Sequence, residues 1–389
     1  MIRDSALPDV AIAGAGLIGL SIAFELAQRG AIVRVYDRGE PARAASWAGA
    51  GMLAPYTESA RDEALLALCA ASLRAYPAFV ERVRASGGVD PHLRLDGIVH
   101  AAFSAAQSAA LEQQASALHA RCVACETFDR ARTLVLEPWL GTHASSALLV
   151  GGEGYVDNRR LGRALAAASA ALGVAIVTSD TLRVECDARR ALGVRSDLGF
   201  TPAGAIVNAA GAWAGALAGV PSESLPRVEP RKGQMLALQT PAGLVRRATW
   251  LPGAYVVPRD DGRLLVGATD ERAGFDVRVT AQGLRTLLDA TLASAPALGD
   301  FAVVETWAGL RPATPDGRPF IGATPTAGLY VAAGHYRNGI LLAPETARVL
   351  CASIAGEPAG DVAAFAFDRA VGAADSAGME TSLHAANGF

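Results

Sequence analysis

The sequence predicts an α/β protein in which a Rossmann-like dinucleotide-binding domain, built from separated segments, carries an inserted α+β domain with a mostly antiparallel sheet. The chain opens with a strand, a glycine-rich turn, a helix and a second strand, and it closes with another strand, glycine turn and helix. Its 389 residues also exceed the ~250–300 residues at which a single core stops growing. Together these observations indicate two structural units.

The opening unit is defined by its hydrophobic pattern. A short apolar run, Val10–Ala13, leads into the turn 14–19, which reads Gly-Ala-Gly-Leu-Ile-Gly. Apolar residues then recur at every fourth position, which predicts a helix that Gly30 stops. The alternating segment 32–36 predicts a second strand that ends at Asp37.

The later elements follow from the same two periodicities. Apolar residues at helical spacing predict helices at 64–84, 104–121, 158–172 and 340–354. Short apolar runs predict strands at 95–103, 174–177, 205–209, 255–258, 264–267 and 329–332. Between 234 and 305 short strands dominate, as expected for an inserted antiparallel domain.

This change of pattern along the chain predicts the domain boundaries. The dinucleotide-binding domain is assigned to residues 1–80, 150–220 and 325–370, and the substrate-binding domain to 81–149 and 221–324. The tail 371–389 is small and polar, and we expect it to fray.

Charge and hydropathy exclude several classes of protein. The chain has 35 Lys+Arg against 38 Asp+Glu, a net charge of -3, which offers no surface for nucleic acid. No apolar stretch approaches the ~20 residues that a membrane-spanning helix needs. The first eight residues show no export signal, so the sequence predicts a cytoplasmic protein.

Cysteine and lysine are both sparse. The 5 cysteines are an odd number, which argues against a disulfide framework. Cys122 and Cys125 form a single CxxC with no second pair and no nearby histidine pair, so we expect no metal site. Lys232 is the one lysine of the chain; coding bias explains this, and a special need for an ammonium group at this position is the alternative.

The glycine turn predicts a dinucleotide site. Gly14 allows the tight turn, Gly16 lets the backbone approach a pyrophosphate, and Gly19 lets the helix pack closely on the strand. The helix N-terminus adds partial positive charge for the phosphates. Asp37 stands where a carboxylate can bind both hydroxyls of a ribose, and its charge disfavours the 2′-phosphate of NADP.

Two further segments favour FAD over NAD. The run 44–52 consists mostly of small residues, which lets the backbone lie flat against a broad ring. The segment 334–339, Gly-His-Tyr-Arg-Asn-Gly, precedes the last predicted helix. Arg337 and that helix N-terminus can stabilise the negative charge of a reduced flavin.

Several longer segments match a known pattern. They are 50–55, 154–161, 208–213, 231–235, 255–259, 309–317 and 334–341. Over about 10–354 the chain resembles the D-amino-acid oxidase superfamily of FAD-dependent oxidoreductases, and within it the glycine oxidases of thiamine biosynthesis. The C-terminal matches, 309–317 and 334–341, are the most specific.

The resemblance implies roles at matching positions. Arg311 resembles the arginine that binds the substrate carboxylate, for which a planar guanidinium offers a bidentate fork. Tyr255 resembles the tyrosine over the substrate, and Arg337 lies in the turn that faces the flavin. The residues expected to contact noncovalent FAD are Gly14, Gly16, Leu17, Ile18, Gly19, Asp37, Arg38, Ser46, Ala50, Gly51, Met52, Leu182, Ala210, Gly211, Trp213, Arg311, Gly334, His335, Tyr336, Arg337, Asn338, Gly339 and Ile340.

The sequence also departs from its relatives. Some glycine oxidases have a histidine two residues before the tyrosine, where this chain has Gly253, so we expect a wider pocket. Sarcosine oxidases attach flavin to a cysteine near the arginine motif and have a lysine on a preceding strand. Here 307–322 contains no cysteine and Leu265 stands near the lysine position, so covalent flavin is not expected.

The implied reaction is oxidative deamination of glycine or a small amino acid. A hydride passes from Cα to flavin N5, the imino acid is hydrolysed to glyoxylate or a keto acid and ammonia, and O2 is reduced to H2O2. The resemblance further implies a place in thiamine thiazole biosynthesis, is compatible with a homo-oligomer, and suggests that a thiazole synthase receives the imine.

Four other readings stay open at this point. A D-amino-acid dehydrogenase would pass electrons to a quinone, and a sarcosine-type oxidase would act on N-methylated amines. A flavoprotein acting on a modified RNA base is disfavoured by the acidic balance of the chain. A non-catalytic flavin-binding module is disfavoured by the presence of both Arg311 and Tyr255.

Overall fold

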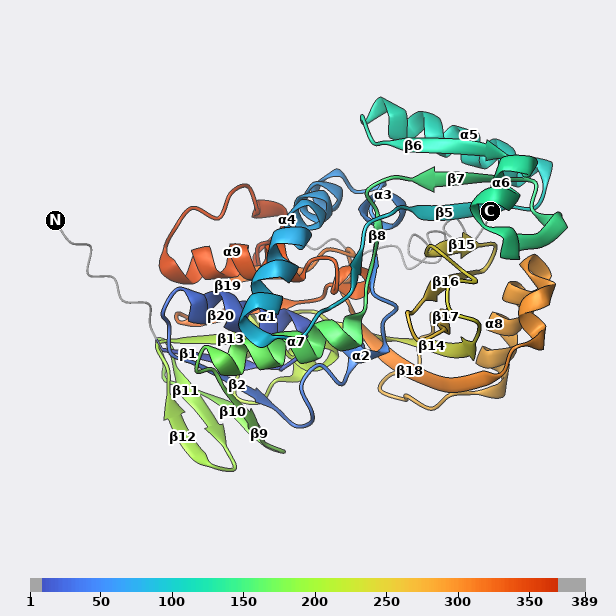
Figure 1. Ribbon diagram of the computed structural model, residues 1–389. Coiled ribbons are helices and arrows are strands. Elements are labelled where there is room, and N and C mark those ends of the chain that lie inside the picture. The colour runs from blue at the N-terminus through green and yellow to red at the C-terminus, as the bar shows by residue number, and fades with distance from the viewer. Residues whose placement is uncertain (1–8, 370–389) are drawn as a thin grey trace.

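The dinucleotide-binding half is built on a six-stranded sheet. The computed structural model describes residues 9–369, and Figure 1 shows this sheet beneath a group of helices. Its strand order is β19 (Phe320–Ala323), β20 (Leu329–Ala333), β13 (Ala205–Asn208), β1 (Val10–Ala13), β2 (Val33–Asp37) and β9 (Ala175–Thr178). All neighbours are parallel except β19, which runs antiparallel to β20. The sheet therefore gathers strands from both ends and the middle of the chain.

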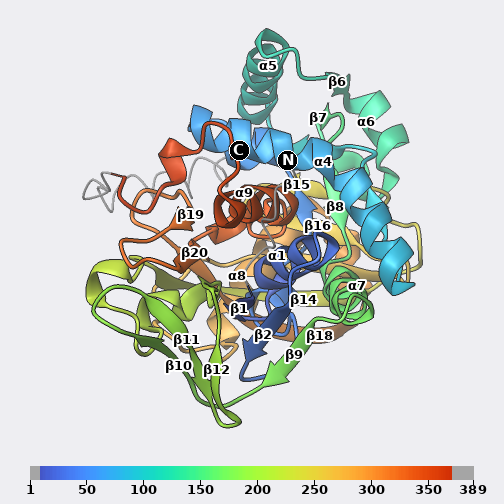
Figure 2. The same cartoon turned by 90° about the vertical axis from the view of Figure 1, so that its left-hand side faces the viewer.

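Four helices lie over one face of this sheet. They are α1 (Leu17–Gln28), α4 (Glu63–Gly87), α7 (Asn158–Ala171) and α9 (Ala343–Ala355), and they also pack on one another (Figures 1 and 2). Among them, α4 forms an outer layer on α7 and α9. Val10 and Ile12 of β1 point into the core under these helices, whereas Ala11 between them packs in a cluster on the other face. This alternation is the period of two that a strand buried on both faces requires.

A small antiparallel sheet covers the opposite face. It consists of β10 (Leu182–Cys186), β11 (Ala191–Ser196) and β12 (Gly199–Pro202). Val184 and Val194 pack with Ile206 of β13, so this sheet closes the second core of the dinucleotide-binding half.

The helix α4 is long and apolar. By length and composition it is the one helix within the described residues 9–369 that could cross a membrane. Its apolar residues, among them Leu73, Tyr76 and Phe79, are buried, and the helix packs against α7 and α9. This is the packing of a core helix.

The other half contains an eight-stranded sheet. Its order is β18 (Val303–Ala313), β14 (Glu229–Gln239), β17 (Arg263–Gly267), β16 (Ala254–Pro258), β15 (Thr249–Leu251), β5 (Ile98–Ala102), β7 (Ser146–Val150) and β6 (Cys125–Asp129). The pairing is antiparallel except between β15 and β5. Helix α8 (Ala281–Ser294) packs on the β14–β17 region, and α5 (Ala105–Ala120) and α6 (Arg130–Leu136) lie near β6 and β7. This is the mostly antiparallel sheet that the sequence predicts.

Short elements connect the two halves. The strands β3 (Met52–Leu53), β8 (Gly154–Val156) and β4 (Leu93–Arg94) form a third small sheet, and the helices α2 (Ala45–Ala48) and α3 (Pro55–Glu58) flank β3. Isolated 3₁₀ turns occur at Pro138–His143, Ser222–Ser224, Pro296–Asp300 and Ala363–Phe365. The elements α2, β3 and α3 thus place the segment 44–58 between the two large sheets.

The predicted fold class is confirmed, with differences at element ends. The last helix begins at Ala343 instead of 340, because the 3₁₀ turn η5 (Tyr336–Asn338) precedes it. The predicted domain boundary at 80 falls inside α4, and the one at 324 separates β19 from its partner β20. The two-domain division itself stays a prediction, and the tail 371–389 lies outside the described residues.

Candidate active site

The turn between β1 and α1 brings main-chain amides to one end of an elongated cavity. Gly14 has φ of +109°, and a Cβ there would lie 2.3 Å from the carbonyl oxygen of Ala209. A Cβ at Gly19 would lie 1.9 Å from the carbonyl oxygen of Gly14, so glycine lets the helix pack onto the turn. Gly16 caps α1, and neither a side-chain cap nor an acidic first turn blocks it. This helix end can therefore receive a pyrophosphate.

Asp37 ends β2 beside this turn. Its Oδ2 accepts a hydrogen bond from the Ala15 N–H at 2.7 Å, and its Oδ1 accepts one from the Gly39 N–H at 3.3 Å. These bonds orient the carboxylate and still leave acceptor capacity on both oxygens. The predicted role in binding ribose hydroxyls is compatible with this geometry.

Next to Asp37, three side chains form a stack. The guanidinium carbon of Arg38 lies 4.0 Å from the ring centre of Trp213. The Trp213 ring stacks in turn on Phe275, with 5.5 Å between the ring centres. Trp213 belongs to the turn η2 (Gly211–Ala216), so the stack joins this turn to the loop after β17.

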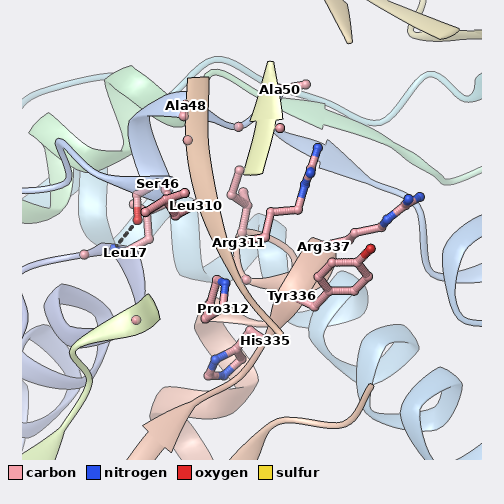
Figure 3. A pocket seen from close by; sticks show the side chains of 18 of the residues that line it. Leu17, Ser46, Ala48, Ala50, Leu310, Arg311, Pro312, His335, Tyr336 and Arg337 are labelled. Atoms are coloured by element: carbon pink, nitrogen blue, oxygen red, sulfur yellow. Dashed lines mark hydrogen bonds between the residues drawn. The ribbon is translucent and has the colours of Figure 1, made fainter. Parts of the chain in front are cut away.

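The segment 44–52 forms one wall of the cavity. Ser46 Oγ accepts a hydrogen bond from the Leu17 N–H at 2.9 Å, which ties the wall to α1 (Figure 3). Gly51 has φ of +83°, and a Cβ there would lie 1.9 Å from the carbonyl oxygen of Val156. The close approach of these two backbones requires glycine at position 51.

The cavity brings most of the predicted FAD residues together. The lining includes Gly16, Leu17, Ile18, Ser46, Ala50, Gly51, Met52, Gly211, Arg311, His335, Tyr336, Arg337, Gly339 and Ile340. The predicted residues outside the lining are Gly14, Gly19, Asp37, Arg38, Leu182, Ala210, Trp213, Gly334 and Asn338. Gly14 and Gly19 shape the turn, as described above; direct contacts to FAD by this second set stay predictions.

Arg311 lies at the far end of the cavity, on β18. Its Nη1 donates a hydrogen bond to the carbonyl oxygen of Thr269 at 3.0 Å. The guanidinium crosses Gly233 of the neighbouring strand β14, where a Cβ would lie 2.4 Å from Nη1 and from Nη2. The missing side chain at Gly233 thus makes room for the Arg311 guanidinium on the neighbouring strand.

Tyr255 lies over a glycine in the same way. It pairs with Gly267 in the β16–β17 register, and a Cβ at Gly267 would lie 2.6 Å from the Tyr255 hydroxyl oxygen. The Trp250 ring packs edge-on against it, with ring centres 5.2 Å apart. Burial raises the pKa of Tyr255 against the opposing effect of Arg311, so the hydroxyl stays protonated and can donate a hydrogen bond.

The expectation of a pocket widened at Gly253 is wrong. Gly253 has φ of +79°, and a Cβ there would lie 3.2 Å from Cβ of Ala290 in α8. Gly253 is also absent from the lining of the cavity. A side chain at 253 would meet the covering helix, because the turn between β15 and β16 points away from the site.

The side chains of the turn 334–339 point in different directions. Figure 3 shows Arg337 and Tyr336 near Arg311, whereas the His335 ring lies apart from them. The His335 Nε2 lies 3.0 Å from Thr346 Oγ1 in α9, and burial lowers the pKa of His335 to about 3. His335 is therefore neutral, and Arg337 supplies the charge of the turn.

Glu58 is a site residue that the sequence reasoning missed. It ends α3 and lines the cavity, and burial raises its pKa against the opposing effects of Arg337 and Arg311. Behind α3, the buried Glu153 accepts hydrogen bonds from the Tyr56 N–H at 2.8 Å and from Thr57 Oγ1 at 3.1 Å. Glu58 lies three residues after the matching segment 50–55, and this closeness was the signal available in the sequence.

Two other residue types singled out in the sequence lie away from the cavity. Lys232 is buried, and its Nζ lies 3.4 Å from Glu271 Oε2, so it forms a structural ion pair. Cys122 is exposed and Cys125 is half-buried, both as free thiols. Within residues 9–369 no group of three or more His, Cys, Asp or Glu side chains is arranged to hold a metal ion.

The cavity fits FAD by its shape and its donors. Main-chain amides at the N-terminus of α1 suit a pyrophosphate, and the mostly small residues of the wall 44–52 leave room for a broad ring system. The chain belongs to the FAD dependent oxidoreductase family, whose model matches residues 9–353.

Individual relatives narrow the similarity within this family. The chain is 36% identical to a glycine oxidase of Pseudomonas putida over 377 residues, which cover 93% of this chain and 99% of that protein. It is 39% identical to a bifunctional ThiO/ThiG protein of Synechocystis sp. over 352 residues; these cover 88% of this chain but 51% of the relative, so the chain spans about half of that protein.

Solved structures also show similarity to glycine oxidases and related amine oxidases. The crystal structure of glycine oxidase from Geobacillus kaustophilus matches with a TM-score of 0.88 and 33% identity, covering 94% of this chain and 99% of that one. An iminodiacetate oxidase from Chelativorans sp. BNC1 matches with a TM-score of 0.83 and 30% identity, covering 92% of this chain and 98% of that one. The predicted resemblance and the predicted cofactor are confirmed.

Proposed function

We propose that the protein oxidatively deaminates glycine or another small amino acid, with O2 as electron acceptor. The amine is oxidised to an imine, which water converts to a keto acid (glyoxylate from glycine) and ammonia, while O2 is reduced to H2O2. When bound, FAD supplies the two-electron acceptor for this reaction. The single observation that carries the proposal is Arg311, which lines the cofactor cavity and lies over Gly233.

Arg311 acts as the clamp for the substrate carboxylate. A guanidinium presents two parallel N–H groups, which match the two oxygens of a carboxylate. The bond from its Nη1 to the Thr269 carbonyl fixes the side chain before substrate arrives. A clamped substrate can turn its Cα–H bond toward the cofactor, and this orientation makes the step effectively unimolecular.

Glu58 and Tyr255 serve the amine end of the substrate. An amine must be neutral before its Cα–H bond is oxidised, so the ammonium proton needs an acceptor. Glu58 lines the cavity, and because burial raises its pKa, its carboxylate is a stronger proton acceptor than that of an exposed glutamate. Tyr255 and Trp250 cover the site and exclude water.

A second candidate substrate is an amine with two carboxylates. Arg311 and Arg337 both line the cavity, and Figure 3 shows their side chains extending to the same side. Two guanidinium groups at one site could bind two carboxylates, as an iminodiacetate oxidase must. Glycine remains the favoured substrate, because Arg337 already has an acidic neighbour in Asp270.

Peroxide release from a panel of amines tests these alternatives. Glycine, N-methylglycine, D-alanine and iminodiacetate should be assayed with wild type and with Arg311→Lys. We expect glycine among the best substrates and a raised KM in the variant. A quinone dehydrogenase would reduce an artificial quinone without consuming O2, and that outcome would replace the oxidase assignment.

The metabolic role follows from the same proposal. Similarity to one half of a ThiO/ThiG protein supports a role in making the imine for thiamine thiazole synthesis. We propose a thiazole synthase as the partner that receives this imine and the cytoplasm as the place of reaction. Growth of a deletion strain with and without thiazole would test the role.

A further inference from the structure

A buried carboxylate lies behind the arginines at the substrate end. Asp270 follows β17, and 1% of its side chain is exposed. Its Oδ1 accepts a hydrogen bond from Arg231 Nε at 2.8 Å, and its Oδ2 accepts one from the Tyr336 hydroxyl. Arg337 Nη2 lies 3.6 Å from the same Oδ2. Tyr336 and Arg337 line the cavity, whereas Asp270 is not part of the lining.

Asp270 carries a negative charge in this setting. Burial alone would raise its pKa, but the positive charges of Arg311 and Arg337 and the hydrogen bond from Arg231 lower it below the usual value. Glu58, the other carboxyl group near these arginines, has its pKa raised by burial. Asp270 is therefore held as an ionised carboxylate beside these arginines.

The charge balance limits which anions can bind. Arg231 stands opposite Arg311 in the β14–β18 register, and Asp270 is the shared counter-ion of Arg231 and Arg337. One substrate carboxylate needs only the fork of Arg311. A second carboxylate would have to bind at Arg337, where Asp270 already offsets the positive charge and repels an incoming anion.

We propose that Asp270 determines substrate specificity: as the ion-pair partner of Arg337 it disfavours amines with two carboxylates relative to glycine. The proposal rests on the proposed function for the reaction itself. Its effect on anion binding can be measured without turnover.

The test uses a matched pair of ligands that have no amine to oxidise. Methoxyacetate carries one carboxylate, and diglycolate is the same ether with two. Dissociation constants for both are measured by calorimetry on the FAD-loaded protein. At separations of roughly 7 Å a lost charge is worth a factor of ten or more, so Asp270→Asn should shift the ratio of the two constants about tenfold toward diglycolate. The kcat/KM ratio of iminodiacetate to glycine should rise by a similar factor.

Three further variants separate charge from structure. Asp289→Asn removes a charge from a side chain that is 69% exposed and should leave both ratios unchanged. Asp270→Glu keeps the negative charge but changes the hydrogen bonds, so the ratio should hold. Arg231→Gln removes a positive charge from the far side of Asp270 and should shift the ratio toward methoxyacetate, which keeps the proposal testable if Asp270→Asn fails to fold.

Equal weakening of both ligands by Asp270→Asn would overturn the proposal, since it would show structural support alone. A shift by Asp270→Glu as large as that by Asp270→Asn would do the same. If wild type oxidises none of the amines, only the proposed function falls, and the ligand titration still decides the role of Asp270.

Discussion

The two ends of the cavity are built on opposite principles. At the cofactor end, Gly14, Gly16 and Gly19 offer main-chain amides and close backbone approaches, and they lie within six consecutive positions. At the substrate end, charged and aromatic side chains converge from separate strands and turns, as Arg311 of β18 and Arg337 of η5 do. The comparison teaches that a pyrophosphate can be held by local backbone geometry, whereas a small zwitterion needs side chains assembled by the tertiary fold.

The largest effect is expected from a change at the cofactor end. Gly14→Val places a side chain against the Ala209 carbonyl at a φ of +109°, so the turn must move. We expect FAD affinity to fall about 100-fold or more, a cost of roughly 3 kcal/mol. Fluorescence titration of the apoprotein measures it. Gly39→Ala, where a Cβ would meet nothing within 4 Å, is the matched control; equal losses in both variants would contradict the assigned role of Gly14.

Arg311→Lys tests the substrate end with the charge retained. Loss of the bidentate fork should raise KM for glycine by roughly 10- to 100-fold, as expected for a charged hydrogen bond worth about 1.5–3 kcal/mol. FAD should stay bound and be released into the supernatant by acid, because no cysteine near Arg311 can hold it. Arg285→Lys, on a side chain 74% exposed, serves as control. An unchanged KM would remove Arg311 from the substrate site.

Gly233→Ala asks whether the two ends can be uncoupled. The new Cβ would lie 2.4 Å from the Arg311 guanidinium and must displace it. We expect kcat/KM for glycine to drop about tenfold, with FAD affinity unchanged. Gly299→Ala, whose Cβ would be 3.4 Å from Leu292, should change neither quantity. A loss of FAD in Gly233→Ala would show that β14 supports both ends.

The last prediction concerns the support of α3 and is measured as stability instead of binding. Burial raises the pKa of Glu153 to about 8, from 4.5. Between these values the folded protein holds a proton that the unfolded chain has lost, so Glu153 destabilises the fold increasingly as pH rises toward 8. The Tm of Glu153→Gln relative to wild type should therefore increase from pH 5 to pH 8. A difference in Tm that does not vary with pH would mean that Glu153 is already ionised in the fold.

The cofactor end of the cavity could be predicted from the sequence more fully than the substrate end. The turn 14–19, its helix and Asp37 could be predicted because their contacts are local and their spacing is fixed by backbone geometry. Arg311 and Tyr255 were identified through resemblance, since nothing in their local sequence shows what they face. Glu58 and Asp270 were missed, because only the folded chain shows which arginines they face. For Glu58 these are Arg311 and Arg337, which lie much later in the sequence. For Asp270 the partner is Arg231 on the strand β14.

Gly253 shows the opposite error. Its position two residues before Tyr255 suggested a place in the pocket, but the tight turn between β15 and β16 reverses the chain at this point. The residue therefore points at Ala290 of α8. Two residues that are close in sequence can be assigned to one site only if the direction in which each side chain points is also known.

The order of strands in the six-stranded sheet also constrains how the chain is made. The first strand, β1, pairs on one side with β2 and on the other with β13, which in turn needs β20 near the end of the described chain. During synthesis, the sheet that begins with β1 cannot be completed until the ribosome has produced the antiparallel half, because β20 follows that half in the sequence. Long waits of this kind slow folding and expose apolar surface to chaperones and aggregation. Nascent chains that end before residue 329 should therefore fail to retain FAD, and the cofactor joins the protein as one of the last events of its assembly.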